Sequence, residues 1–178
     1  RLGIQMIEFD TNTSDYNLLS NLPDEIHGLV FCPGSILLKP FQRLTTDDFL
    51  NDFQQNVLGA VQMIQKLLPA MKKANGASIV LFSTVASKLG MPFHASIAAS
   101  KSAIEGLAKS LAAEFAMSKI RVNVIAPSLT DTPLADKFLN SDEKKEKAAQ
   151  RNPMKKVGTP QDIAQATLFL LNNSSNWM

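Results

Sequence analysis

The amino-acid sequence predicts an α/β protein, a doubly wound parallel sheet covered by helices on both faces, and two observations favour that class. Short apolar runs of strand length alternate with longer segments in which apolar residues recur at three- and four-residue steps. The chain has 178 residues, of which 45% are hydrophobic, and this suits one domain with a substantial core. We therefore expect residues 1–178 to form a single domain with its ligands at the carboxyl ends of the strands.

The first third of the chain contains two predicted strands. Residues 3–9 have the apolar character of a short strand, and a brief helical segment follows around residues 16–22. Residues 26–31 form the second predicted strand, closed by a turn at residues 32–34 that contains a Pro-Gly pair. Such a pair between a strand and a helix is typical of an α/β unit.

A long helix is predicted after Thr45, ending at Asn75 and Gly76. The Thr45 hydroxyl can accept from the free amides of the first turn, and the acidic pair that follows suits the helix dipole. An apolar stripe at helical spacing is predicted to face the core: Leu50, Phe53, Val57, Val61, Ile64 and Leu68.

The second half of the chain continues the alternation. Residues 77–82 and 120–125 are predicted strands, with a second long helix over residues 94–117 between them. The charged, lysine-rich segment 134–151 is the best candidate for a mobile flap. A last helix is predicted after Thr159, with proline at its first position and a capping-box pattern.

Charge and cysteine content exclude several classes of function. The formal net charge is +2, with acidic and basic residues interleaved, so we expect neither nucleic acid nor a membrane surface as a partner. The single cysteine, Cys32, rules out an intramolecular disulfide and a cysteine-rich metal site. The chain has no signal peptide and no apolar run of about 18 residues. These features predict a cytoplasmic protein without a metal centre.

The second long helix carries the most informative stretch, Ile97-Ala98-Ala99-Ser100-Lys101. With its spacing from upstream polar residues, it makes the chain from Asp10 to Met178 resemble the classical short-chain dehydrogenase/reductases, which have a Rossmann-like fold. In that family the helix carries Tyr-x-x-x-Lys, whose tyrosine donates the proton that accompanies hydride transfer. Ile97 fills the tyrosine position, and the only tyrosine, Tyr16, lies far upstream.

The resemblance implies roles for three further residues of the active site. Asn56 aligns with a catalytic asparagine that helps hold a water for proton relay, although an asparagine in a helix can also simply face solvent. Thr84 matches the serine that hydrogen-bonds the substrate carbonyl, with neighbouring Ser83 as the alternative. Lys101 matches the lysine that binds the nicotinamide ribose and lowers the pKa of the tyrosine.

The resemblance also implies NAD or NADP as the cofactor. Asp10 sits where the family has an aspartate that bonds the adenine amino group, and Cys32 and Gly34 lie in the turn that approaches the nucleotide. The segment after residue 125 resembles the family's Pro-Gly-x-Ile-x-Thr motif, which holds the nicotinamide half, and implicates Pro127, Ser128, Thr130 and Thr132. The residue that selects NAD or NADP belongs to a segment this chain lacks.

The absent tyrosine leaves two functions open. The first is an NAD(P)-dependent oxidoreductase that acts on a small carbonyl or alcohol substrate, with His94 as a candidate proton donor because imidazole titrates in the right range. His94 can equally be a loop or cap residue, and Ser96 and a water held by Lys101 and Asn56 are weaker candidates. The second is a catalytically impaired relative that acts as a nucleotide-binding or scaffolding protein.

The resemblance finally implies what lies beyond this chain. The family's glycine-rich turn for the pyrophosphate belongs to a first βαβ unit that is missing here. We expect the natural protein to carry about 40–50 further N-terminal residues, the size of such a unit, and a strand after its final helix. The resemblance also implies a homodimer or homotetramer built on the two long helices. The second of these offers small residues for such contact: Ala99, Ala103, Gly106, Ser110 and Ala113.

Overall fold

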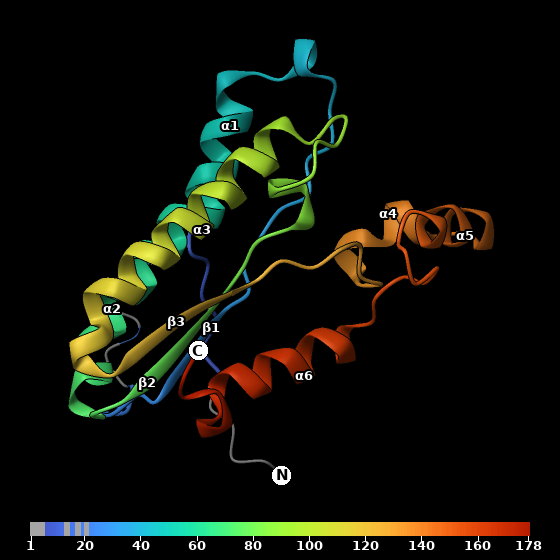
Figure 1. Ribbon diagram of the computed structural model, residues 1–178. Helices are drawn as coiled ribbons and strands as arrows, with labels where there is room; N and C mark the ends of the chain where they lie inside the picture. Colours follow the sequence, from blue (N-terminus) through green and yellow to red (C-terminus); the bar gives the residue numbers. More distant parts are fainter. Residues whose placement is uncertain (1–5, 13–14, 17–18, 20–21) are drawn as a thin grey trace.

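The computed structural model describes residues 6–12, 15, 16, 19 and 22–178, and its centre is a parallel sheet between two layers of helices (Figure 1). The strands β1 (Gly28–Phe31), β2 (Ala77–Phe82) and β3 (Ile120–Ile125) lie in the order β1-β2-β3. Two helices, α2 (Gly59–Lys73) and α3 (Ala95–Phe115), cover one face, and α6 (Pro160–Leu171) covers the other. The predicted fold class is confirmed.

The middle strand organises the core. All residues of β2 except the last are buried, because β1 and β3 pair with both of its edges and helices cover both of its faces. Two of the predicted strands have the bounds found in the structure, and the predicted strand 26–31 is shorter, starting at Gly28. The core between the sheet and the helices includes Val57, Ile64, Leu67, Met71, Ile79, Leu81, Ile104, Phe115 and Ile120.

The first long helix begins as predicted and then departs from the predicted pattern. Thr45 and Asp48 form a reciprocal capping box at the start of α1 (Thr46–Phe53). Leu50 and Phe53, predicted to face the core, are 60% and 40% exposed, so that part of the prediction is wrong. A π-helical turn, Gln54–Leu58, separates α1 from α2. Because a π turn contains an extra residue, it rotates the preceding helix relative to the following one.

The second long helix and the last helix match their predictions closely. α3 spans Ala95–Phe115, within two residues of the predicted bounds. The following turn closes at Lys119, a non-glycine residue in the left-handed region with φ of 56°. Thr159 and Asp162 form the predicted capping box at the start of α6, with proline at the first position. No helix in the described part of the chain is long and apolar enough to span a membrane.

The first predicted strand is not found among the described residues, and the candidate flap is helical. Residues 6–9 form no strand, and residues 3–5 of that predicted element lie outside the described residues, as does most of the predicted helical segment 16–22. A strand needs a neighbour that pairs its backbone groups, and residues 6–9 join no ladder. The proposed flap 134–151 folds mainly as two helices, α4 (Asp136–Leu139) and α5 (Asp142–Gln150).

Candidate active site

A buried lysine marks the carboxyl end of the sheet. The Lys101 side chain comes from α3, and its Nζ donates a hydrogen bond to the carbonyl oxygen of Phe82, the last residue of β2, at 3.0 Å. Lys101 is only 9% exposed. Burial lowers its pKa to about 8, while the negative charges of Asp52 and Cys32 act in the opposite direction. The site therefore holds an amine whose charge changes near physiological pH.

Asn56 meets Lys101 beside Gly34. The π-helical turn carries Asn56, which is 1% exposed and donates from Nδ2 to the backbone oxygen of Asp52 at 2.8 Å and to Ser35 Oγ at 3.2 Å. Its Oδ1 finds no donor among the described residues. A Cβ built on Gly34 would lie 3.4 Å from that Oδ1 and 3.5 Å from Lys101 Nζ. A free acceptor and an ammonium donor thus face the space beside Gly34, as binding of a polar ligand requires.

The two hydroxyls after β2 have different surroundings. Ser83 is buried, and its Oγ lies 2.7 Å from Glu105 Oε1 and 3.3 Å from the carbonyl oxygen of Lys101. Thr84 is half-buried, and its Oγ1 accepts a bond from the amide of Ala86 at 3.3 Å. The Ser83 hydroxyl is therefore committed to α3, whereas the Thr84 hydroxyl retains its proton for another acceptor.

The start of α3 carries the two residues that bear on proton transfer. Ile97 is buried, with 5% of its surface exposed, and offers only carbon atoms. His94 precedes the helix and is half-buried, with Nδ1 2.7 Å from the carbonyl oxygen of Pro92. A carbonyl can only accept, so Nδ1 carries the proton, and Nε2 is the nitrogen left to exchange one.

The loop after β3 closes the far side of the candidate site. The amide of Val85, beside Thr84, donates to the carbonyl oxygen of Pro127 at 3.1 Å, which joins the ends of β2 and β3. Thr130 Oγ1 donates to the carbonyl oxygen of Ser128 at 3.1 Å and is occupied locally. Thr132 is half-buried and borders a shallow hollow with Asp131, Pro133 and Asp136.

Cys32 and Asp10 are the remaining residues that the sequence assigned to the cofactor. Cys32 has an exposed free thiol whose pKa is raised by desolvation and lowered by the charge of Lys101, and it therefore belongs to the same neighbourhood. Asp10 is exposed and accepts from the amide of Asn12 at 2.8 Å. The structure thus brings Asn56, Lys101, Gly34 and Cys32 together.

Two polar residues of the site were missed from the sequence, Asp52 and Ser35. Asp52 is 3% exposed, and its carboxylate accepts hydrogen bonds from Ser35 Oγ and Ser96 Oγ, both at 2.5 Å. One signal was available, because Asp52 and Asn56 are four residues apart and share a helix face. The sequence prediction instead assigned the core-facing side of the helix to the apolar stripe that includes Leu50.

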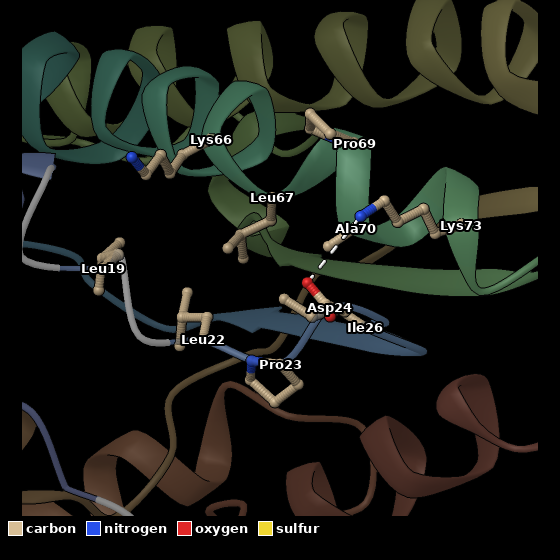
Figure 2. A pocket seen from close by; sticks show the side chains of 10 residues that line it. All are labelled: Leu19, Leu22, Pro23, Asp24, Ile26, Lys66, Leu67, Pro69, Ala70 and Lys73. Carbon is tan, nitrogen blue, oxygen red and sulfur yellow. Dashed lines mark ion pairs between the residues drawn. The ribbon is translucent and has the colours of Figure 1, made fainter.

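A second hollow lies beside α2, away from this site. It is bordered by Leu22, Pro23 and Ile26 on one side and by Leu67, Ala70 and Lys73 of α2 on the other (Figure 2). Lys73 Nζ lies 3.9 Å from Asp24 Oδ1 across it, and both side chains are largely exposed. Leu22, Pro23 and Ile26 precede β1, so the hollow lies at the amino end of that strand, whereas Lys101 lies at the carboxyl end of the sheet.

Comparison with known proteins gives a consistent set of relatives. A family model described as enoyl-(acyl carrier protein) reductase matches residues 17–178. A tropinone reductase homologue of Arabidopsis thaliana is 34% identical over 137 residues, which are 77% of this chain and 52% of the relative. A 3-oxoacyl-[acyl-carrier-protein] reductase of Thermotoga maritima is 33% identical over 136 residues, 76% of this chain and 54% of the relative. The chain spans about half the length of these curated relatives.

Solved structures show the same similarity. The protein ElxO, with NADP bound, matches with a TM-score of 0.79 and 30% identity over 85% of this chain and 62% of that chain. A tyrosine-to-phenylalanine variant of ElxO, with NADPH bound, matches with a TM-score of 0.80 and 29% identity over 86% and 63% of the two chains. A short-chain dehydrogenase family protein of Francisella tularensis matches with a TM-score of 0.83 and 27% identity over 92% and 69%.

Proposed function

Because this chain belongs to the short-chain dehydrogenase/reductase family, we propose that it is part of an NAD(P)-dependent oxidoreductase that interconverts a carbonyl and an alcohol. The observation that carries the proposal is the convergence of Asn56 Oδ1 and Lys101 Nζ on the space beside Gly34. A buried acceptor without a donor and a buried amine fit a ribose, whose hydroxyls can both donate and accept.

The residues that would hold the nucleotide come from α3, from the loops after β1 and β3, and from the segment before β1. Lys101 would donate to the ribose hydroxyls, and the backbone at Gly34 would pass close to the nucleotide because no side chain intervenes. The segment from Pro127 to Thr132 would contact the nicotinamide half, and Asp10 the adenine. When bound, the nicotinamide supplies or accepts a hydride.

The protein's own part in the chemistry is orientation and proton supply. The Thr84 hydroxyl would donate to the substrate oxygen, which Ser83 cannot do while it is bonded to Glu105. Ile97 can neither give nor take a proton, and losing a general acid costs a factor of about 10²–10⁴ in rate. A water held by Asn56 Oδ1 and Lys101 would be the remaining proton source, with the His94 imidazole as a second candidate, and turnover would be slow.

The ElxO structures support binding without a tyrosine hydroxyl. A relative with a Tyr→Phe change is described with NADPH bound, so in that protein the loss of a tyrosine hydroxyl is compatible with nucleotide binding. The replacement of the catalytic tyrosine by Ile97 therefore leaves a nucleotide site as a reasonable expectation for this chain. The cofactor can be NAD or NADP, and the proposal covers any small carbonyl substrate.

The second candidate function is a nucleotide-binding or scaffolding protein without turnover. The burial of Ile97, at 5% exposed, favours it, because the side chain packs as part of the fold and offers no reactive group. The two functions differ in their requirement for a proton donor. Turnover that falls in His94→Ala or Lys101→Ala would favour the oxidoreductase, and nucleotide binding without turnover over a broad carbonyl panel would favour the scaffold.

The deciding experiment is a titration of the natural-length protein with NADH and NADPH, followed by nicotinamide fluorescence. The oxidoreductase proposal expects saturable binding of one nucleotide that weakens in Lys101→Ala and is unchanged in Lys109→Ala, an exposed lysine of the same helix. Failure of a folded protein to bind either nucleotide would overturn it.

We extend the proposal to organisation and location. Residues 1–178 would act as one domain, and two copies would pair through α3, where a stripe of exposed small residues runs along the helix: Ala99, Ser102, Gly106, Ser110 and Ala113. The exposed Leu50 and Phe53 of α1 add apolar surface to the described helices. The cytoplasm is the proposed compartment, because the lone thiol of Cys32 suits a reducing environment.

A further inference from the structure

Asp52 is a buried carboxylate that the mechanism above does not use. It lies on α1 and is 3% exposed. An ionised carboxylate is seldom buried unless it is paired and hydrogen-bonded, because moving the charge out of water is costly. Its presence beside Asn56 and Lys101 therefore calls for a function.

The contacts of Asp52 connect three parts of the site. Ser35 Oγ donates to Oδ1 and Ser96 Oγ donates to Oδ2, both at 2.5 Å. Ser35 follows Gly34, and Ser96 precedes Ile97 on α3. The Asn56 side chain joins the same network, since it donates to Ser35 Oγ and to the Asp52 backbone oxygen. One carboxylate thus fixes the loop after β1, α1 and α3 relative to one another.

Asp52 also acts on Lys101 through its charge. Lys101 Nζ has one hydrogen-bond acceptor among the described residues, the carbonyl oxygen of Phe82, which carries no net charge. The charged groups that act on this ammonium are Asp52 from α1 and Cys32 from the loop after β1. Glu105, one turn further along α3, is paired with Lys88 at 2.6 Å and bonded to Ser83. Asp52 is therefore the carboxylate available to stabilise the buried charge.

We propose that Asp52 is a positioning residue that keeps Lys101 protonated in its buried site and, through Ser35 and Ser96, holds Gly34 and the start of α3 in place around it. The inference deepens the proposed function, on which its consequence for nucleotide binding rests. The charge relation between Asp52 and Lys101 is a property of the protein without nucleotide and can be measured separately.

The effect on the lysine is large enough to change its state at working pH. With a pKa of about 8, Lys101 is mostly charged at pH 7. In Asp52→Asn the opposing negative charge is gone, and burial continues to disfavour the ammonium. We expect the midpoint of the Lys101 titration to fall by about one pH unit or more. The lysine would then be mostly neutral at pH 7.5, and its hydrogen bonds to a ribose would weaken.

The primary test is the titration of Lys101 itself. The natural-length protein is prepared with ¹³Cε-labelled lysine, and the ¹³Cε shift is followed from pH 6 to pH 11, with Lys101→Arg to assign the signal. Asp52→Asn is compared with Asp47→Asn, which removes an exposed carboxylate from the same helix. A lower midpoint in Asp52→Asn alone supports the inference. An unchanged midpoint in folded Asp52→Asn overturns it.

Two further measurements separate the possible outcomes. Circular dichroism establishes that each variant is folded, and if Asp52→Asn is not, Asp52→Ser removes the charge while keeping a hydroxyl for the network. Asp52→Glu should keep the midpoint within a few tenths of a pH unit, which a merely steric role would not predict. NADPH affinity at pH 7.5 should fall about threefold or more in Asp52→Asn, because the charged fraction of Lys101 falls by that factor, and should recover on lowering the pH to 6.

The failure of the inference and that of the proposed function remain distinguishable. A shifted Lys101 titration in a protein that binds neither NADH nor NADPH would leave the Asp52 role intact and remove the oxidoreductase. Normal NADPH binding with an unshifted Lys101 titration in Asp52→Asn would leave the oxidoreductase proposal intact and overturn the role of Asp52. A pH-independent loss of NADPH binding in Asp52→Asn would also contradict the charge role, because the site would then be lost through its shape alone.

Discussion

Ser83 Oγ donates a hydrogen bond to Glu105 Oε1 at 2.7 Å, and this contact fixes the end of β2 against α3. The carboxylate also accepts from Ser87 and pairs with Lys88 at 2.6 Å. The segment that carries Thr84 is thereby held at both of its ends. Glu105 therefore fixes this segment relative to α3, the helix that carries Lys101.

We expect Glu105→Gln to destabilise the protein at neutral pH by about 1–3 kcal/mol, the range for hydrogen bonds to a charged group. These bonds lower the pKa of Glu105 to about 2 from its ordinary 4.5. Their contribution is therefore fully present above pH 4.5 and is lost as the pH falls toward 2. Urea denaturation should show a wild-type advantage at pH 7 that narrows at pH 3. If the difference in unfolding free energy between wild type and Glu105→Gln were the same at both pH values, the negative charge of Glu105 would not be its cause.

A second prediction concerns the stability cost of the buried lysine. Because the pKa of Lys101 is lowered to about 8, the folded state disfavours the charged form, and this penalty applies below pH 8. Replacing the lysine by methionine removes the charge and keeps most of the apolar stem. We expect Lys101→Met to be more stable than wild type by about 1–3 kcal/mol at pH 7, with nucleotide affinity lost.

The pH dependence of that gain provides the check. The wild-type penalty is relieved as the pH rises from 8 toward 10.5, so the advantage of Lys101→Met should shrink over that range in thermal or urea unfolding. Lys109→Met, at an exposed position of α3, serves as the control and should leave stability within about 0.5 kcal/mol of wild type. A less stable Lys101→Met would mean that the hydrogen bond to Phe82 and the attraction of Asp52 together outweigh desolvation.

The elements predicted correctly from the sequence are those whose pattern lies in neighbouring residues. The strand 77–82 is mostly apolar and the strand 120–125 largely alternates apolar with polar residues, and the caps at Thr45 and Thr159 involve residues three positions apart. The family motif likewise located Asn56 and Lys101, which the structure brings together at Gly34.

The missed features depend on contacts between distant segments. Asp52, Ser35 and Ser96 form their network across separations of 17 and 44 residues, which no periodic pattern records. Leu50 was predicted to face the core but is exposed. A repeat of apolar residues does not reveal the π-helical turn that follows α1 and changes which side of α1 faces the core. Residues 6–9 have the composition of a strand, but a strand also needs a partner.

The proposed pairing through α3 predicts a disruptive substitution that leaves the fold intact. A Cβ added at Gly106 would meet nothing within 4 Å, and the residue is exposed, so we expect Gly106→Trp to fold normally. In a dimer packed on the small-residue stripe, the indole would overpack the interface by about 1–3 kcal/mol, weakening association about ten- to a hundredfold. Sedimentation should show a shift toward monomer, and Glu146→Trp, exposed on α5, should sediment like wild type.

The last prediction introduces the tyrosine of the family motif, which this chain lacks at position 97. Ile97→Tyr recreates Tyr-x-x-x-Lys with Lys101 one helical turn away, so that a hydroxyl would lie next to an amine that lowers its pKa. We expect NADPH- or NADH-dependent reduction of a responsive carbonyl to rise about 10²–10⁴-fold. Ile97→Phe supplies the same ring without the hydroxyl and carries a similar packing cost, about 1–3 kcal/mol, because Ile97 is buried. A gain confined to Ile97→Tyr would show that the rest of the site is competent and that wild type lacks only a proton donor. Equal, unimproved rates in both folded variants would mean that position 97 is not aimed at the substrate.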